Sequence, residues 1–351
     1  MAHHLAIIGY GGMGSWHHQN IKEHIEGITV TGAYDIRPEV EETAIQNGIR
    51  FYHNLEELLN DESVDIVTVA TPNNFHKELV VSCLEHGKNV ICEKPVAMNS
   101  KELEEMMAAA KKSGKLFSIH QNRRWDKDYV MIKQIVKDQV IGTPYFIESR
   151  VQGSRRSLDG WRGYKVNGGG MVYDWGVHLL DQMLDLIPSP VVSVDAHLFQ
   201  IFSEEVDDNF KAFLRFENGI SALVEIATNC FINQPRWHMS CTDGTAVIED
   251  WECNGKMVKL SSDEKMEWTN DIVYTAAGPT RTMAPRPVHT TTQLPLPQVE
   301  TDWANYYKNI ADVIDNGAEL IVKPEQALRV LNVIDAIFES QRTGQSIKCH
   351  I

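Results

Sequence analysis

The sequence predicts a mixed α/β protein of two domains, in which a doubly wound parallel sheet precedes an α+β domain with a large, mostly antiparallel open sheet. Three observations predict it. The chain has 351 residues, 43% of them hydrophobic, which is enough for two hydrophobic cores. Short apolar runs alternate with helical patterns to about residue 120, and longer strands of alternating polarity follow from about residue 143. We place the domains at residues 1–122 and 123–351.

The first half of the chain shows the pattern of a parallel sheet. Apolar runs occur at residues 5–8, 28–34, 66–70, 89–92 and 116–119. Amphipathic stretches, such as residues 79–84 and 103–110, separate them. Buried strands that alternate with helices form βαβ units, so we expect a parallel sheet covered on both faces.

The second half shows the pattern of a sheet with one buried face. Strands of alternating polarity are expected at residues 144–151, 191–202, 210–216 and 220–227, with a hairpin turn at residues 217–219. Helices are expected at residues 303–316 and 324–343, the second beginning with Pro324 and ending before Gly344. Residues 278–297 contain five prolines and several threonines. This segment is a linker, a substrate lid or a subunit-contact arm, and the sequence does not choose among them.

Composition restricts the partners and the compartment. A formal net charge of −15 argues against nucleic acid as a partner. The sequence shows neither a run of eighteen apolar residues nor a signal peptide, so we expect no membrane association and a cytoplasmic protein. The six cysteines form no C-x-x-C pair, and adjacent histidines such as His17 and His18 do not have metal-ligand spacing. We therefore expect reduced cysteines and no metal site.

A glycine-rich turn after the first strand predicts a dinucleotide site. The segment from Gly9 to Gly14 fits G-x-G-x-x-G, with Gly11 as its second glycine. It follows a strand and opens a helix, and Asp35 lies about 20 residues further on, as in a Rossmann domain. The free N–H groups at the start of the helix would bind the pyrophosphate. Asp35 would accept hydrogen bonds from the ribose hydroxyls and repel a 2′-phosphate, favouring NAD over NADP, although Arg37 could partly accommodate that phosphate.

Polar residues follow two further strands. Thr71, Pro72, Asn73 and His76 follow the run at 66–70, and Glu93 and Lys94 follow the run at 89–92. The carboxyl ends of parallel strands are where open α/β sheets bind ligands. Further on, three glycines at 168–170 precede Asp174 and His178, which are four residues apart and would share one face of a helix.

The order of these motifs resembles the glucose–fructose oxidoreductase/inositol dehydrogenase/rhizopine-catabolism (Gfo/Idh/MocA) family. The resemblance extends over nearly the whole chain and includes T-P-N-x-x-H, E-K-P, N-R-R-W, W-R at Trp161 and Arg162, D-x-x-x-H, and P-E-Q-A-L in the last helix. It implies an NAD-dependent dehydrogenase that oxidises a secondary hydroxyl of a sugar, glycoside or cyclitol.

The resemblance also implies roles for individual residues. Lys94 would bind the reacting hydroxyl, His178 would act as general base in oxidation, and Asp174 would bind substrate and hold both in a polar network. The expected cofactor contacts are Gly9, Gly11, Gly12, Met13, Gly14, Asp35, Arg37, Thr71, Pro72, Asn73, His76, Glu93 and Lys94. The expected substrate contacts are Lys94, Asn122, Arg123, Trp161, Asp174 and His178. An open sheet with an uncovered face, together with the resemblance, predicts a homodimer or homotetramer through the C-terminal sheet.

Simpler and rival interpretations remain open at this point. Lys94 could be a surface lysine, His178 a hydrogen-bonded core histidine, and Trp161 a packing residue. One rival function is an NAD-dependent glycosidase that uses transient oxidation and elimination, which would not accumulate NADH. Another is a non-catalytic NAD-binding regulator, which would have no use for a base beside Lys94.

Overall fold

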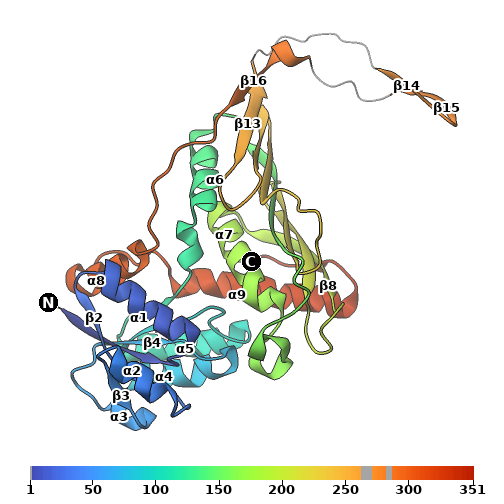
Figure 1. Cartoon of the computed structure of the whole chain (residues 1–351). Helices are drawn as coiled ribbons and strands as arrows, with labels where there is room; N and C mark the ends of the chain where they lie inside the picture. Colours follow the sequence, from blue (N-terminus) through green and yellow to red (C-terminus); the bar gives the residue numbers. More distant parts are fainter. Residues whose placement is uncertain (1, 262–270, 282–286) are drawn as a thin grey trace.

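Two sheets organise the protein (Figure 1). The computed structural model describes residues 2–261, 271–281 and 287–351. A parallel six-stranded sheet belongs to the N-terminal half, and a mostly antiparallel nine-stranded sheet belongs to the C-terminal half. The predicted fold class is confirmed. Within the described ranges, no helix is long and apolar enough to cross a membrane.

The six-stranded sheet has the order β3-β2-β1-β4-β5-β6. Its strands are β1 (His3–Ile8), β2 (Ile28–Tyr34), β3 (Arg50–Tyr52), β4 (Ile66–Val69), β5 (Asn89–Cys92) and β6 (Phe117–Ile119). The helices between them are α1 (Gly12–His24), α2 (Val40–Gln46), α3 (Leu55–Leu59), α4 (His76–Glu85) and α5 (Ser100–Ser113). The chain goes from β1 to one side of the sheet and returns to the other side at β4. This reversal opens a crevice at the carboxyl ends of β1 and β4, where the glycine turn lies.

The nine-stranded sheet has the order β16-β13-β12-β11-β7-β10-β9-β8-β17. Its strands are β7 (Pro144–Gln152), β8 (Val191–Phe199), β9 (Asn209–Phe216), β10 (Ser221–Ala227), β11 (Trp237–Cys241), β12 (Gly244–Ile248), β13 (Gly255–Leu260), β16 (Thr291–Leu294) and β17 (Ile347–Lys348). The expected hairpin turn at 217–219 joins β9 and β10, which pair antiparallel. The pairing of β10 with β7 is parallel.

Within the described part of the chain, helices cover one face of the nine-stranded sheet and leave the other without a helix (Figure 1). They are α6 (Lys127–Asp138), α7 (Val177–Leu186) and α9 (Pro324–Thr343). On the covered face, alternate residues such as Ala222, Val224 and Ile226 are buried. The helix α9 begins with Pro324 and is closed by Gly344 in the left-handed conformation at φ 64°, as the sequence predicts.

The helix α8 (Asn305–Asn316) lies beside the N-terminal sheet, although it belongs to the last part of the sequence (Figure 1). Its Tyr307 hydroxyl contacts His17 Nδ1 at 2.5 Å, and Asp315 contacts His3 at 3.1 Å. A helix that follows the predicted domain boundary at residue 122 therefore packs against the domain that precedes it.

The described residues at the two ends of the segment 278–297 belong to strands, which a simple linker would not contain. Their first part, β15 (Gly278–Arg281), forms a projecting hairpin with β14 (Ile272–Thr275). Residues 282–286 lie outside the described residues. The last part contains β16, which pairs with β13 at the edge of the large sheet.

Candidate active site

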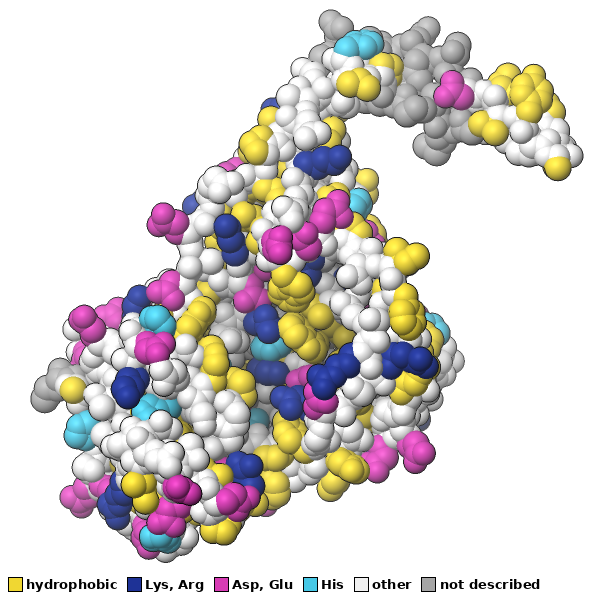
Figure 2. All heavy atoms as spheres, viewed as in Figure 1, with side chains coloured by type: hydrophobic (Ala, Val, Ile, Leu, Met, Phe, Trp, Pro, Cys, Tyr) yellow, Lys and Arg dark blue, Asp and Glu magenta, His cyan; other side chains and the backbone are white. Residues whose placement is uncertain are grey.

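Two adjoining cavities lie where the halves of the protein meet, in the hollow that Figure 2 shows. The first cavity has a volume of about 820 Å³ and extends along the carboxyl ends of the parallel strands. The second cavity, of about 700 Å³, lies between α1, α7 and the nine-stranded sheet. The residues that line both cavities are Met13, Glu93, Lys94, Arg162 and Asp174. A ligand that fills the first cavity would meet a ligand in the second at these residues.

The glycine turn builds one end of the first cavity. A Cβ atom at Gly9 would lie 2.6 Å from the Ala70 carbonyl oxygen, and one at Gly14 would lie 2.2 Å from the Gly9 carbonyl oxygen. Both distances are too short for a side chain, so both positions require glycine. Gly9 requires it also because its φ is +90°. A Cβ at Gly12 would meet nothing within 4 Å, so the backbone there is open to the cavity. The first N–H groups of α1 have no acceptor within the helix, which suits the pyrophosphate of a dinucleotide.

Asp35 and Arg37 lie together at the same end. Arg37 Nε and Nη2 donate to the two carboxylate oxygens of Asp35, each at 3.0 Å. Burial alone would raise the pKa of Asp35, but the hydrogen bonds and charge of Arg37 lower it below its ordinary value. Arg37 could donate hydrogen bonds to a 2′-phosphate, but it already forms an ion pair with Asp35, the carboxylate that would repel that phosphate.

The predicted segment after β4 divides into lining and supporting residues. Thr71, Pro72 and Asn73 line the first cavity. His76 lines neither cavity: its two ring nitrogens contact the carbonyl oxygens of Thr71 and Pro95, each at 2.9 Å. It connects the loop after β4 to the loop after β5. Gly14 is likewise a packing residue rather than a lining residue.

Lys94 and Asp174 meet at the junction of the two cavities. Lys94 Nζ donates to the backbone oxygen of Asp174 at 2.9 Å and lies 3.4 Å from its Oδ1, which also accepts from Arg162 Nε at 3.0 Å. Burial would raise the pKa of Asp174, but the charges of Lys94 and Arg162 lower it. The carboxylate is thus held ionised between two cations. Asp174 lies in a π-helical turn, Val172–Gly176, that leads into α7.

His178 lies one turn further on and lines the second cavity. It is only 5% exposed, and its Nδ1 has no hydrogen-bond partner among the described residues. Burial, and then the positive charges of Lys94 and Arg123, hold its pKa well below 6.5. A neutral imidazole next to the cavity can accept a proton, which is the property that a general base requires.

The remaining predicted substrate contacts separate. Asn122 and Arg123 line the second cavity, whereas Trp161 lines only the first. The Arg123 guanidinium lies 4.2 Å from the ring centre of Trp175 and forms an ion pair with Asp126 at 3.0 Å.

Sequence reasoning assigned no role to Trp16, Arg162 or Trp175, which also line the second cavity. The three-residue spacing from Met13 to Trp16 could have indicated that both lie on one face of α1. Arg162 was part of a quoted motif, but its contact with Asp174 depends on how the glycine-rich loop folds.

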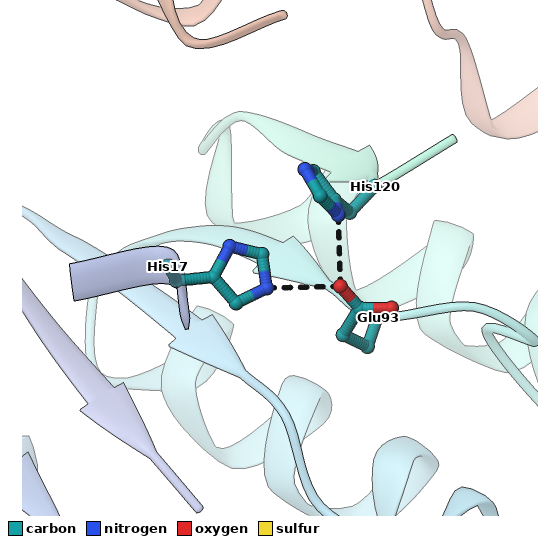
Figure 3. A group of neighbouring side chains, drawn as sticks. All are labelled: His17, Glu93 and His120. Carbon is teal, nitrogen blue, oxygen red and sulfur yellow. Dashed lines mark hydrogen bonds and ion pairs between the residues drawn. The ribbon is translucent and has the colours of Figure 1, made fainter. Parts of the chain in front are cut away.

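A buried cluster surrounds Glu93 (Figure 3). His17 Nε2 and His120 Nδ1 both contact Glu93 Oε1, at 2.9 Å and 2.8 Å. These three ligand atoms lie within 4.8 Å of one another, as in a metal site. Hydrogen bonds to a single carboxylate oxygen already explain the arrangement, so the absence of a metal stays our prediction. His17 lies beside His120 across the Glu93 carboxylate, whereas His18 contacts the Tyr10 hydroxyl.

Comparisons with known proteins agree with this geometry. Residues 3–121 match the oxidoreductase family with an NAD-binding Rossmann fold, and residues 129–247 match the Gfo/Idh/MocA C-terminal domain. A scyllo-inositol 2-dehydrogenase (NADP(+)) of Bacillus subtilis, IolW, is 28% identical over 98% of this chain and 95% of its own. A myo-inositol 2-dehydrogenase of Thermotoga maritima is 28% identical over 63% of this chain and 67% of its own. The crystal structure of an NAD-binding protein from Listeria innocua is 44% identical and covers 99% of both chains, with a TM-score of 0.94. The chain belongs to the Gfo/Idh/MocA family of oxidoreductases.

Proposed function

We propose that the protein is an NAD-dependent dehydrogenase that oxidises a secondary hydroxyl of a sugar, glycoside or cyclitol. The observation that carries the proposal is that Lys94 and Asp174 meet at the junction of the two cavities, while His178 lines the second cavity within reach of the Lys94 charge. The first cavity has the glycine turn and the size for a dinucleotide. The second has polar groups and aromatic walls suited to a polyol. The inositol dehydrogenases among the relatives support this substrate class.

Each residue has a chemical task in the proposed reaction. Bound nicotinamide dinucleotide would supply the hydride acceptor. The Lys94 ammonium would donate to the reacting hydroxyl oxygen and stabilise its alkoxide character. Neutral His178 would accept the hydroxyl proton. Asp174 fixes Lys94 from the other side and would accept a hydrogen bond from a neighbouring hydroxyl of the substrate.

NAD is the proposed cofactor, with NADP used less well. The ionised Asp35 carboxylate would repel a 2′-phosphate, and Arg37 is occupied by Asp35. The name of the Bacillus subtilis relative shows that NADP is used within the family, so this preference is a property to be measured on this chain.

The test is a screen of cofactor reduction with inositols, free pyranoses and glycosides. We expect NADH to accumulate with at least one of them. Lys94→Ala should abolish turnover but leave dinucleotide binding within a few fold, because the glycine turn and Asp35 provide most of that binding. Lys137→Ala, an exposed lysine outside both cavities, is the matched control. Dinucleotide binding without turnover across the whole panel would instead support the regulator, and products released without net NADH would support the glycosidase.

A further inference from the structure

The proposed reaction leaves one buried ionisable group at the junction without a task. Glu93 is 5% exposed, precedes Lys94, and lines both cavities. Its Oε1 accepts from His17 on α1 and from His120 after β6 (Figure 3). Its Oε2 accepts from the Lys94 backbone N–H at 3.1 Å. A carboxylate that receives three hydrogen bonds is stabilised in its charged form.

The hydrogen bonds indicate that the cluster carries a negative charge. The Glu93 carboxylate can only accept, so each imidazole uses an N–H toward it. His17 Nδ1 then accepts from the Tyr307 hydroxyl, and burial raises the pKa of that hydroxyl well above its ordinary value, so it keeps its proton. Burial also lowers the pKa of His120. Burial alone would raise the pKa of Glu93, but its interactions with His120 and His17 hold it well below the ordinary range.

The charge of Glu93 is what makes the junction neutral. Lys94 and Arg162 contribute two positive charges there and Asp174 one negative charge, which leaves one positive charge without Glu93. Among the described residues, the titratable groups that face Glu93 are His17, His76, Cys92, Lys94, His120, His178, Tyr306 and Tyr307.

We propose that Glu93, held ionised by His17 and His120, shifts the cofactor preference of the site toward the oxidised nicotinamide. The inference rests on the proposed function, which brings the nicotinamide to this junction. The oxidised ring has one positive charge that the reduced ring lacks. The Glu93 anion therefore favours binding of the oxidised form, and without it the junction would carry one net positive charge that disfavours the cationic ring. Glu93 is in this sense a tuning residue, and His17 and His120 are positioning residues that act through it.

The test compares binding of the two cofactor forms, with no turnover involved. Dissociation constants for NAD⁺ and NADH would be measured by calorimetry on the wild type and on Glu93→Gln, which keeps the size and removes the charge. We expect the ratio Kd(NADH)/Kd(NAD⁺) to fall by about five- to tenfold in the variant, as for a partly screened unit charge. Glu225→Gln is the matched control, because Glu225 is a buried carboxylate in an ion-pair cluster outside both cavities. Its ratio should equal that of the wild type.

A second variant keeps the inference testable if Glu93→Gln does not fold. His120→Phe removes one donor, so the pKa of the buried Glu93 should rise toward neutrality. Its ratio should then fall as the pH is lowered from 8 to 6, while the wild-type ratio stays constant. The inference is overturned if Glu93→Gln has the same Kd ratio as the wild type, or if His120→Phe keeps the wild-type Kd ratio at every pH from 8 to 6. Either result leaves the dehydrogenase proposal intact. Failure of the wild type to bind either cofactor form overturns both.

Discussion

His178 is the residue whose loss should separate proton transfer from binding. His178→Ala removes the proton acceptor and should lower kcat for oxidation by about 10²–10⁴-fold, the usual contribution of general acid–base groups. The base must be neutral to act, and its pKa lies well below 6.5. The wild-type kcat/KM should therefore stay constant as the pH falls through 6.5 and decline only below it. His197→Ala, on the exposed face of β8, is the control for a histidine change elsewhere. If His178→Ala keeps near-normal turnover and an unchanged pH profile, His178 is not the base, and Lys94 would be the residue that accepts the hydroxyl proton.

The Asp35–Arg37 ion pair should determine how strongly the two cofactors are distinguished. Asp35→Ser removes the carboxylate that would repel a 2′-phosphate and frees the Arg37 guanidinium. We expect its kcat/KM to fall for NAD and to rise for NADP, so the preference should narrow by about tenfold or more, which is one charge interaction of about 1.4 kcal/mol. The double variant Asp35→Ser/Arg37→Ala should not show this rise in kcat/KM for NADP, because it lacks the Arg37 guanidinium. A wild type that prefers NADP tenfold would contradict the assignment.

Sequence motifs identified the candidate reacting residues but not the buried residues that support them. Lys94, Asp174 and His178 follow strands or glycine runs at positions that local pattern can identify. The contacts of Glu93 join residues 17, 93 and 120 with Tyr307 of α8, and no local spacing predicts them. Asp207 is a similar case, since it supports the turn of Asp174 from another loop.

The π-helical turn that carries Asp174 depends on Asp207. The buried Asp207 Oδ2 accepts from the Val172 backbone N–H at 2.8 Å, and Met171 N donates to the Asp207 backbone oxygen at 3.0 Å. Asp207→Ala leaves the Val172 N–H without its acceptor, which should cost about 1–3 kcal/mol in the free energy of unfolding. It should also raise KM, because Asp174 loses its fixed position.

The pH dependence of Asp207 gives this turn a second test. Burial raises the pKa of Asp207 to about 6 from 3.8, so the folded state binds its proton more tightly than the unfolded state. Its contribution to stability is then largest at low pH and decreases as the pH rises from about 4 to 6. Asp207→Asn keeps an acceptor without a charge. Relative to wild type, the variant should gain stability as the pH rises from about 4 to 6, measured by urea unfolding. If the difference in unfolding free energy between the variant and the wild type does not change with pH, the pKa of Asp207 is not raised in the folded protein.

Elements with a continuous apolar run or strong periodicity were predicted better than strands that contain polar residues and glycines. The strands β2, β5 and β9, and the whole of α9, begin and end within a residue of the expected ranges. The strand β3 has only three residues, and β11, β12 and β13 were not expected. These strands contain polar residues and glycines, and pairing with neighbours far along the chain forms them.

The uncovered face of the nine-stranded sheet makes a prediction for the whole molecule. Phe146, Phe213 and Leu223 lie on the face opposite the helices, where Phe146 and Phe213 have ring centres 6.0 Å apart. Ion pairs of Arg150 and Lys211 with Glu225 flank them. An apolar patch rimmed by charges on an open sheet is typical of a subunit interface. We therefore expect a homodimer or homotetramer that packs through this face.

Phe213→Lys should dissociate that assembly, because each lysine would place an unpaired charge at the centre of the patch. Light scattering at micromolar concentration should show a larger species for the wild type and a smaller one for the variant. Ile45→Lys, an exposed apolar position on α2, should leave the mass unchanged. A monomeric wild type would contradict the interface. An unchanged mass in Phe213→Lys would mean that the subunits contact each other through another surface. The next surface to substitute would then be the projecting β14–β15 hairpin, where Val273 and Tyr274 are exposed.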